Sequence, residues 1–254
     1  MTKYELLKQK FQNQELVIGT TISMINSSLL VEKMNRPDLD FILFDAEHGV
    51  FDAQNVVTNL QVCRLMGLPS FVRVQDSEYF LAAKLIDMGA DGFMLPRTET
   101  LEQLRTAVDA LLFSPVGRKG MGGHGQFRPG EKFADFPKTR FLLPQIESPK
   151  GIENLPAMLE NYGEFIDAII IGPYDMSAMV GTPQNITSPI MLESIQKVFD
   201  ICRAHGKSCG IFCDDEVKAQ LFRDMGANVL WVGTDGVFFG RGYGEIMNKV
   251  AQIK

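Results

Sequence analysis

The sequence has few cysteines and no long hydrophobic run, and each shortage excludes a class of protein. None of its four cysteines lies in a Cys-x-x-Cys pair, so reduced, buried thiols are favoured over a disulfide scaffold or a metal cage; they are Cys63, Cys202, Cys209 and Cys213. No apolar stretch approaches the roughly 20 residues needed to cross a bilayer. Residues 1–14 carry mixed charges, unlike a secretory signal peptide. We therefore expect a cytoplasmic protein without a membrane partner.

Positive charge is also in short supply. The chain has 25 Lys and Arg residues against 31 Asp and Glu residues, a formal net charge of −6. Nucleic acid is an unexpected partner for such a chain, because a basic surface is what offsets phosphate repulsion. The 254 residues are 45% hydrophobic and 22% charged, which is typical of a globular protein that can bury a substantial core.

Short apolar, strand-like runs alternate along the chain with segments of helical spacing. The predicted strands are Leu16–Ser23, Phe41–Glu47, Ser70–Gln75, Gly92–Pro96, Phe141–Glu147, Ala168–Gly172, Ser208–Cys213 and Val229–Thr234. These runs are nearly continuous in apolar residues, as strands covered on both faces require. Between them, Gln54–Met66 and Glu78–Met88 each place apolar residues on one side of a helix.

Eight strands alternating with helices over about 250 residues predict a (β/α)8 barrel. A doubly wound open sheet is the alternative, but that fold has a glycine-rich turn after its first strand. Here Asn26, Ser27 and Ser28 follow that strand instead. We predict one domain over residues 1–254, with a long active-site loop at about 113–140 that is rich in Gly and Pro.

Polar and charged residues gather where the predicted strands end. They are Asp45, Glu47 and His48 after the second strand, Arg73 and Gln75 on the third, Arg97 after the fourth, Gln145 and Glu147 on the fifth, and Tyr174 and Asp175 after the sixth. Active sites of such barrels lie at the carboxyl ends of the strands. Charged side chains on apolar strands are costly unless they are paired or bind a metal, so we expect one polar site at this rim.

Two carboxylates at neighbouring strand ends suggest a divalent metal site. Gln145 and Glu147 are two residues apart and point the same way, while Asp175 follows the adjacent strand. Carboxylate and amide oxygens suit Mg²⁺ or Mn²⁺, and zinc is disfavoured because these strands lack His and Cys. The alternative is structural: Glu147 would pair with Arg73, and Asp175 would cap the next helix. We favour the metal because the acids occur together.

His48 and Arg73 are candidates for moving protons and for binding an anion. His48 lies beside Asp45 and Glu47, and a rim histidine oriented by a carboxylate is well placed for acid–base work. Arg73 lies within an apolar strand, where a buried guanidinium must meet an anion. That anion is either Glu147 or an oxyanion that develops in the reaction.

The long loop contains the string Gly120-Met121-Gly122-Gly123-His124-Gly125, which has GxGxxG spacing. It follows no strand and opens no apolar helix, so we reject a dinucleotide site. A lid carrying His124, Gln126 and Arg128 over the rim is our prediction, and a solvated surface loop is the alternative. No chemical role is assigned to His124 or Arg128.

Several of these motifs together resemble the HpcH/HpaI aldolase family, the metal-dependent pyruvate aldolases. They are Asp45-Ala46-Glu47-His48-Gly49, Val72-Arg73-Val74, Gly89-Ala90-Asp91-Gly92 with Pro96, Gln145-Ile146-Glu147, the segment 171–177, and Val232-Gly233-Thr234-Asp235. They occur in the expected order between about Thr20 and Phe239. The resemblance implies a (β/α)8 barrel, usually a homohexamer, that cleaves or forms a 4-hydroxy-2-oxo acid to give pyruvate and an aldehyde.

The resemblance also implies roles for individual residues. Glu147 and Asp175 would bind the divalent cation (Mg²⁺, Mn²⁺ or Co²⁺), and His48 would be the acid–base residue. Asp87 would match the acid that raises the basicity of His48, and Arg73 would stabilise the enolate. The substrate would contact Gln145 and the segment Gly172-Pro173-Tyr174-Asp175. Lys119 and Tyr174 depart from the common family pattern, which leaves the aldehyde open.

The aldolase class and two alternative functions remain to be weighed. No lysine lies at a strand end, which disfavours a Schiff-base aldolase and supports the metal-dependent class. A citramalyl- or malyl-CoA-type lyase is the first alternative, although the acidic chain shows no extended basic groove for CoA phosphates. A non-catalytic barrel that binds a small oxo acid is the second, and uncompensated charges on one rim argue against it.

Overall fold

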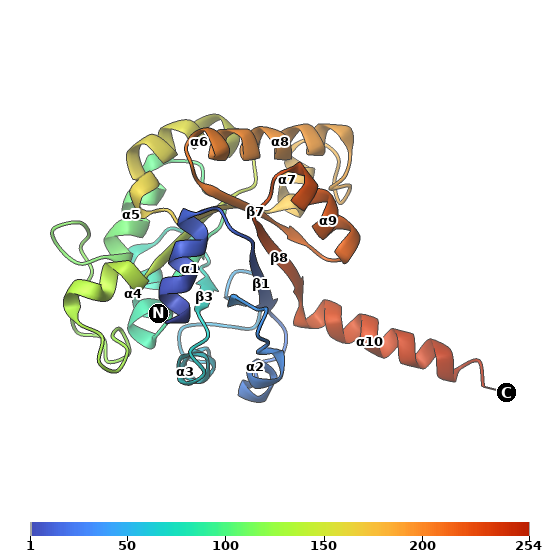
Figure 1. The fold of residues 1–254 in the computed structure, drawn as a ribbon, viewed down its shortest axis with the longest axis horizontal. Helices are drawn as coiled ribbons and strands as arrows, with labels where there is room; N and C mark the ends of the chain where they lie inside the picture. The colour runs from blue at the N-terminus through green and yellow to red at the C-terminus, as the bar shows by residue number, and fades with distance from the viewer. Residues whose placement is uncertain (1, 254) are drawn as a thin grey trace.

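The computed structural model describes residues 2–253 and shows a closed barrel of parallel strands (Figure 1). Each strand pairs with the next in sequence, and the last pairs with the first. The strands are β1 (Val17–Ile22), β2 (Phe41–Asp45), β3 (Ser70–Arg73), β4 (Gly92–Leu95), β5 (Phe141–Ile146), β6 (Ala168–Ile171), β7 (Ser208–Cys213) and β8 (Val229–Thr234). The predicted (β/α)8 barrel is confirmed, and every strand ends within two residues of its expected end.

Helices connect the strands, as the alternating sequence pattern predicted. They are α1 (Lys3–Gln12), α2 (Ser28–Met34), α3 (Val57–Leu65), α4 (Tyr79–Met88), α5 (Leu101–Leu111), α6 (Pro149–Tyr162), α7 (Pro173–Met179), α8 (Pro189–Ala204), α9 (Glu216–Met225) and α10 (Asp235–Val250), with 3₁₀ turns η1 (Phe133–Thr139) and η2 (Gly163–Phe165). Side-chain caps explain several of the starts, because Thr100 and Ser148 accept backbone N–H groups of α5 and α6. Helix α4 ends at Gly89, which takes the left-handed conformation with φ 110°.

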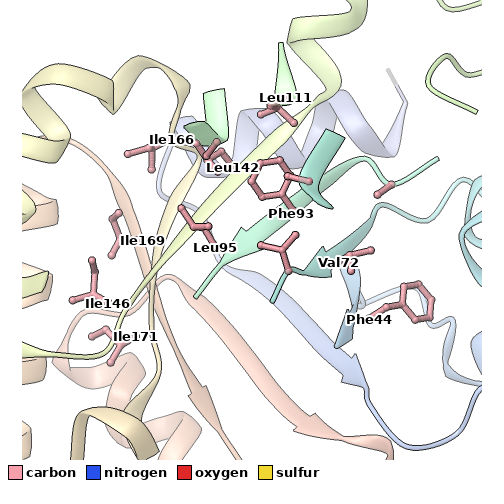
Figure 2. Close-up of a cluster of buried hydrophobic side chains, with 14 of the residues drawn as sticks. Phe44, Val72, Phe93, Leu95, Leu111, Leu142, Ile146, Ile166, Ile169 and Ile171 are labelled. Carbon is pink, nitrogen blue, oxygen red and sulfur yellow. The ribbon is translucent and has the colours of Figure 1, made fainter. Parts of the chain in front are cut away.

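The alternation of side chains along each strand divides the core into two layers. Outward-facing residues such as Phe44, Val72 and Ile169 pack between the strands and the helices, as Figure 2 shows. Inward-facing residues such as Phe41 and Phe71 fill the barrel, where their rings lie 5.0 Å apart. Because side chains alternate with period two, the residue two positions after an inward-facing residue also faces inward. At the carboxyl end of a strand, this residue faces the mouth of the barrel.

Helix α1 closes the opposite end of the barrel, at the amino ends of the strands. Its buried residues Leu7 and Phe11 belong to the interior cluster, and the Phe11 ring lies 6.1 Å from that of Phe141 on β5. Lys8 pairs with Asp167, just before β6, at 2.7 Å. The mixed-charge start of the chain therefore forms an amphipathic helix that covers this end of the barrel. The mouth at the carboxyl ends of the strands stays open.

The long segment 113–140 lies at the amino ends of the strands, so the predicted active-site lid is wrong for this chain. It connects α5 to β5, and helix-to-strand connections lie at the end of the barrel opposite to the carboxyl ends of the strands. Arg128 donates to Asp91, just before β4, at 2.5 Å and lies 3.6 Å from the Tyr4 ring of α1. Gln126 is buried there, whereas His124 is exposed.

Helix α10 extends away from the barrel, and its end lies far from every other element (Figure 1). Large apolar side chains on it are exposed, namely Phe238, Phe239, Tyr243, Ile246, Met247 and Val250. Across residues 2–253, no helix combines the length and the apolar character needed to cross a membrane. All four cysteines are free and buried, as expected.

Candidate active site

A cavity of about 170 Å³ opens at the carboxyl ends of the strands, where the sequence predicted the site. Its lining residues are Thr21, Asp45, His48, Arg73, Gln145, Glu147, Gly172, Pro173, Tyr174, Asp175, Phe212, Trp231 and Thr234. The structure thus brings together every predicted site residue except Asp87. Strand periodicity explains the gathering, since Asp45, Arg73 and Gln145 each follow an interior-facing apolar residue by two positions.

Buried oxygens of Glu147 and Gln145 face this cavity without partners. Glu147 Oε2 accepts the backbone N–H of Arg97 at 2.9 Å. In the described part of the chain, nothing donates to Glu147 Oε1 or to Gln145 Oε1. Gly172 leaves the space beside them open, because a Cβ there would lie only 1.9 Å from Glu147 Oε1. An unpaired buried acceptor is costly, so these oxygens need a ligand.

The charge of Glu147 is equally uncompensated. Burial raises the pKa of this carboxyl to about 8, and the charges of Asp175 and Glu47 raise it further against the opposing N–H bond from Arg97. Two carboxylates and an amide oxygen fit a hard divalent cation, which would relieve both the desolvation and the repulsion. Within residues 2–253, no three His, Cys, Asp or Glu side chains converge as a ligand set.

Arg73 pairs with Asp45, and the predicted structural alternative of an Arg73–Glu147 ion pair is not observed. Arg73 Nε and Nη2 donate to the two oxygens of Asp45 at 2.9 and 2.6 Å. Nη1 of Arg73 lies 3.3 Å from Glu47 Oε2. Burial alone would raise the pKa of Asp45, but the bidentate guanidinium outweighs it and keeps that pKa below its ordinary value.

Asp45 also shapes the loop that carries His48. Its Oδ1 accepts the backbone N–H groups of Glu47 at 3.1 Å and His48 at 3.2 Å. Gly49 completes this tight turn, because a Cβ there would lie 2.2 Å from the Asp45 carbonyl oxygen. The His48 ring itself is largely exposed, with Nε2 3.8 Å from Glu47 Oε2. The histidine therefore reaches the mouth of the cavity on a fixed backbone.

Within the single chain Asp87 lies away from His48, and its expected role of raising the basicity of that histidine stays a prediction. Asp87 lies in the last turn of α4, which has run from the rim back to the amino ends of the strands. There its carboxylate forms an ion pair with the buried Lys119, and its carbonyl oxygen accepts the Gly125 N–H at 2.8 Å. Residues at the two ends of a barrel helix are too far apart to share one proton.

Sequence reasoning missed the backbone role of Arg97. Its φ of 47° is unusual for a residue with a side chain, and this conformation directs its N–H to Glu147. Its guanidinium donates to the Gln75 carbonyl oxygen at 3.0 Å and lies 3.5 Å from Glu47. The position at a strand end was a signal for a rim residue, but a positive φ cannot be read from an arginine.

Phe212 and Trp231 were also missed as cavity residues. They lie on interior-facing positions of β7 and β8, and their rings are 5.0 Å apart at 74°. In the sequence they are two apolar residues in apolar strands, with the same periodicity as residues that only fill the barrel.

A closed (β/α)8 barrel whose open mouth combines carboxylates, a histidine and an arginine is the arrangement typical of barrel enzymes that act on small molecules. Comparison with known proteins narrows the class. Residues 23–241 match the family described as HpcH/HpaI aldolase/citrate lyase, and this chain belongs to that family. The predicted family resemblance is thereby confirmed.

Individual relatives agree with this assignment. A 5-keto-4-deoxy-D-glucarate aldolase from Citrobacter koseri is 31% identical over 230 residues, covering 89% of this chain and 88% of the relative. The crystal structure of an HpcH/HpaI aldolase from Desulfitobacterium hafniense superposes with a TM-score of 0.89 at 24% identity, covering 98% of this chain and 97% of that one. An HpcH/HpaI aldolase/citrate lyase family protein from Burkholderia cenocepacia gives 0.88 at 25% identity, covering 98% and 100%.

Proposed function

We propose that this barrel is a divalent-metal-dependent aldolase that cleaves or forms a 4-hydroxy-2-oxo acid, with pyruvate and an aldehyde as the other reactants. The observation that carries this proposal is the pair of buried, unpartnered acceptors, Glu147 Oε1 and Gln145 Oε1, facing the same cavity as Asp175. Such a set binds a hard cation and the chelating oxygens of a 2-oxo acid.

Glu147 and Asp175 would hold the cation (Mg²⁺, Mn²⁺ or Co²⁺), with the Gln145 amide beside it. Bound there, the cation would supply Lewis-acid stabilisation of the charge on the 2-oxo oxygen. The first-turn N–H groups of α7, after Gly172 and Pro173, have no acceptor within their helix and can bind the substrate carboxylate. Tyr174 follows them at the mouth of the cavity.

Arg73 and His48 would divide the remaining work. The Arg73 guanidinium is fixed by Asp45, and so its charge is preorganised to stabilise the enolate oxygen. His48, exposed at the mouth, would take the proton of the 4-hydroxyl group during cleavage and return it during synthesis. The Glu47 carboxylate lies 3.8 Å from Nε2 of the ring.

The direct test is exchange of the methyl protons of pyruvate in D₂O, which reports enolate formation without the second substrate. We expect exchange with Mn²⁺, Mg²⁺ or Co²⁺, loss of exchange in excess EDTA, and recovery after metal is added back. Arg203→Gln, at the exposed end of α8 and away from the rim, is the matched control. Full exchange in EDTA would contradict the metal. Absence of exchange under every condition, together with cleavage of a CoA ester, would favour the citramalyl- or malyl-CoA-type alternative.

We also propose that the chain forms a homo-oligomer, which the family resemblance implies is a hexamer. A groove of about 360 Å³ lies on the outer face of the barrel beside β1 and β8, where Ile18, Leu39 and Val232 are among the lining residues. Phe238, near the start of α10, also lines this groove, and the helix then extends away from the barrel (Figure 1). Large apolar side chains along this helix are exposed. Exposed apolar surfaces of this kind mark interfaces.

Light scattering is expected to give a mass several times that of a single chain. Ile246→Glu, in the exposed row of α10, should shift the mass towards the monomer because a buried carboxylate without a partner is costly. Glu245→Gln, on the polar side of the same helix, is the control. A monomer in the wild type at micromolar concentration would contradict the proposal.

A cytoplasmic location is proposed from the four free thiols, and cell fractionation tests it.

A further inference from the structure

The cavity has two chemically different sides. Because the strands run in sequence order around the barrel, β7 and β8 lie on one arc between the metal-site acids on β5 and β6 and His48 after β2. That arc contributes Phe212 and Trp231. The other arc runs through β3 and contributes Arg73. A substrate that spans from the acids to the histidine therefore has an aromatic flank and a cationic flank.

The aromatic flank is continuous from the mouth to the floor of the cavity. Tyr174, which is 39% exposed, marks the mouth, and its ring centroid lies 6.1 Å from that of Phe212. Phe212 in turn contacts Trp231, which is only 4% exposed. The Arg73 guanidinium carbon lies 5.5 Å from the Trp231 ring centroid, so the inner end of the aromatic flank lies close to the residue proposed to stabilise the enolate. We call Tyr174, Phe212 and Trp231 the aromatic wall.

The polar atoms along the aromatic wall already have partners within the protein. Trp231 Nε1 donates to the Thr21 hydroxyl, and the Tyr174 hydroxyl donates to Asp214 at 3.1 Å. The Thr21 and Thr234 hydroxyls each accept an N–H group, from Trp231 and from the backbone of α10, and each keeps its own O–H to donate. This side of the cavity therefore offers a bound molecule aromatic faces and two threonine hydroxyls, with no Lys or Arg among the described residues that line it.

We infer that the aldehyde handled by this site carries an apolar substituent, aliphatic or aromatic, that lies against the aromatic wall. The inference rests on the proposed aldolase function and specifies its second substrate. A carboxylate placed against these rings would lose its water without gaining a cationic partner, and a hydroxyl would find a partner only in the two threonine hydroxyls. An apolar group would gain burial, and an aromatic ring would gain edge-to-face contacts as well.

A carboxylated aldehyde would need a cationic partner, and Arg73 is the one Lys or Arg among the described residues that line the cavity. Its guanidinium is bound by Asp45 and is assigned to the enolate oxygen. Arg97 is not among the lining residues, and its guanidinium lies 3.5 Å from Glu47 Oε1. The lining thus offers no second cation, which favours the apolar assignment.

The test compares aldehydes as acceptors for pyruvate in the metal-loaded wild type. Isobutyraldehyde and benzaldehyde represent the apolar class, and glycolaldehyde and glyoxylate represent the polar and carboxylated classes. We expect kcat/KM to favour the apolar class by roughly tenfold or more, the scale set by one or two methylene groups in an apolar pocket. Equal or better use of glycolaldehyde or glyoxylate would overturn the inference.

Phe212→Ser should reduce the apolar-to-polar kcat/KM ratio by roughly tenfold, because a hydroxyl replaces the centre of the aromatic wall. Phe212→Leu should keep the preference for isobutyraldehyde and reduce that for benzaldehyde. The ratio is measured within one preparation, so partial misfolding does not change it. Phe80→Ala, an exposed phenylalanine on α4, should leave the ratio unchanged. An unchanged ratio in Phe212→Ser would also overturn the inference.

The pyruvate exchange assay separates this inference from the proposed function. Metal-dependent exchange in the wild type, combined with a preference for glyoxylate, would leave the aldolase proposal intact and remove only the apolar substituent. Absence of exchange would remove the aldolase proposal itself.

Discussion

Glu147→Gln is expected to weaken Mn²⁺ binding by roughly 100-fold or more, because loss of a residue that only supports a ligand already costs 10- to 100-fold. Glutamine keeps the size of the side chain and an oxygen for the Arg97 N–H, so the change removes mainly the charge. Metal-dependent pyruvate exchange should fall to the background rate. Isothermal titration with Mn²⁺ and the exchange assay measure the two effects.

The same variant should alter the pH dependence of metal binding. In the metal-free wild type the carboxyl of Glu147 has a pKa of about 8, mainly because it is buried. Below that pH a cation must displace a proton, so wild-type affinity should fall as the pH drops from 8, by up to about tenfold per unit. Glutamine has no proton to displace, and this part of the pH dependence should disappear.

Glu153→Gln is the matched control, since Glu153 is an exposed carboxylate on the helix that follows the same strand. It should leave both the affinity and its pH dependence unchanged. Wild-type affinity in Glu147→Gln would show that the cation is bound elsewhere, and the proposed metal site would have to be abandoned.

The rim of the barrel could be predicted because two simple regularities act together there. The apolar runs defined the strands, and period-two alternation then placed Gln145 and Glu147 on the inner face at the open end. The same reasoning placed Arg73 at the rim but left two anions as its possible partner, Glu147 and an oxyanion of the reaction. The structure adds a third, Asp45, because β2 and β3 are neighbours in register at these two residues.

Asp87 and the segment 113–140 lie away from the rim of their own barrel for one common reason. Both lie after a helix has crossed the barrel and before the next strand begins, and a chain that has passed down a helix is at the amino ends of the strands. The order of elements in the sequence contained this information. It was outweighed by family resemblance for Asp87 and by glycine content for the segment.

Other features could not be read from one sequence. The left-handed backbone of Arg97 is imposed by its surroundings, since arginine has no preference for it. The aromatic wall depends on which apolar strand residues occupy the last interior layer, and this is a matter of register. The departure of α10 from the barrel likewise has no local signal, because an apolar helix face is the same whether it covers its own barrel or another surface.

Arg73→Ala is expected to reduce kcat/KM for aldol cleavage. The expected loss of transition-state stabilisation is on the order of 2–4 kcal/mol, the range for a removed oxyanion donor. A loss of activity in this variant could have a second cause, because the Arg73 guanidinium also neutralises the buried Asp45 through two hydrogen bonds. Its removal would leave an unpaired buried carboxylate and lower the free energy of unfolding. Activity and stability must therefore be measured on the same proteins.

Combining Arg73→Ala with Asp45→Asn separates the two effects. The asparagine side chain carries no charge, so the double variant should be more stable in urea than Arg73→Ala alone while its kcat/KM stays low. Arg73→Lys supplies a further comparison, since lysine keeps the charge but cannot bind both oxygens of Asp45. If kcat/KM recovered along with stability in the double variant, Arg73 would be a structural partner of Asp45, and the enolate would have to be stabilised by other groups.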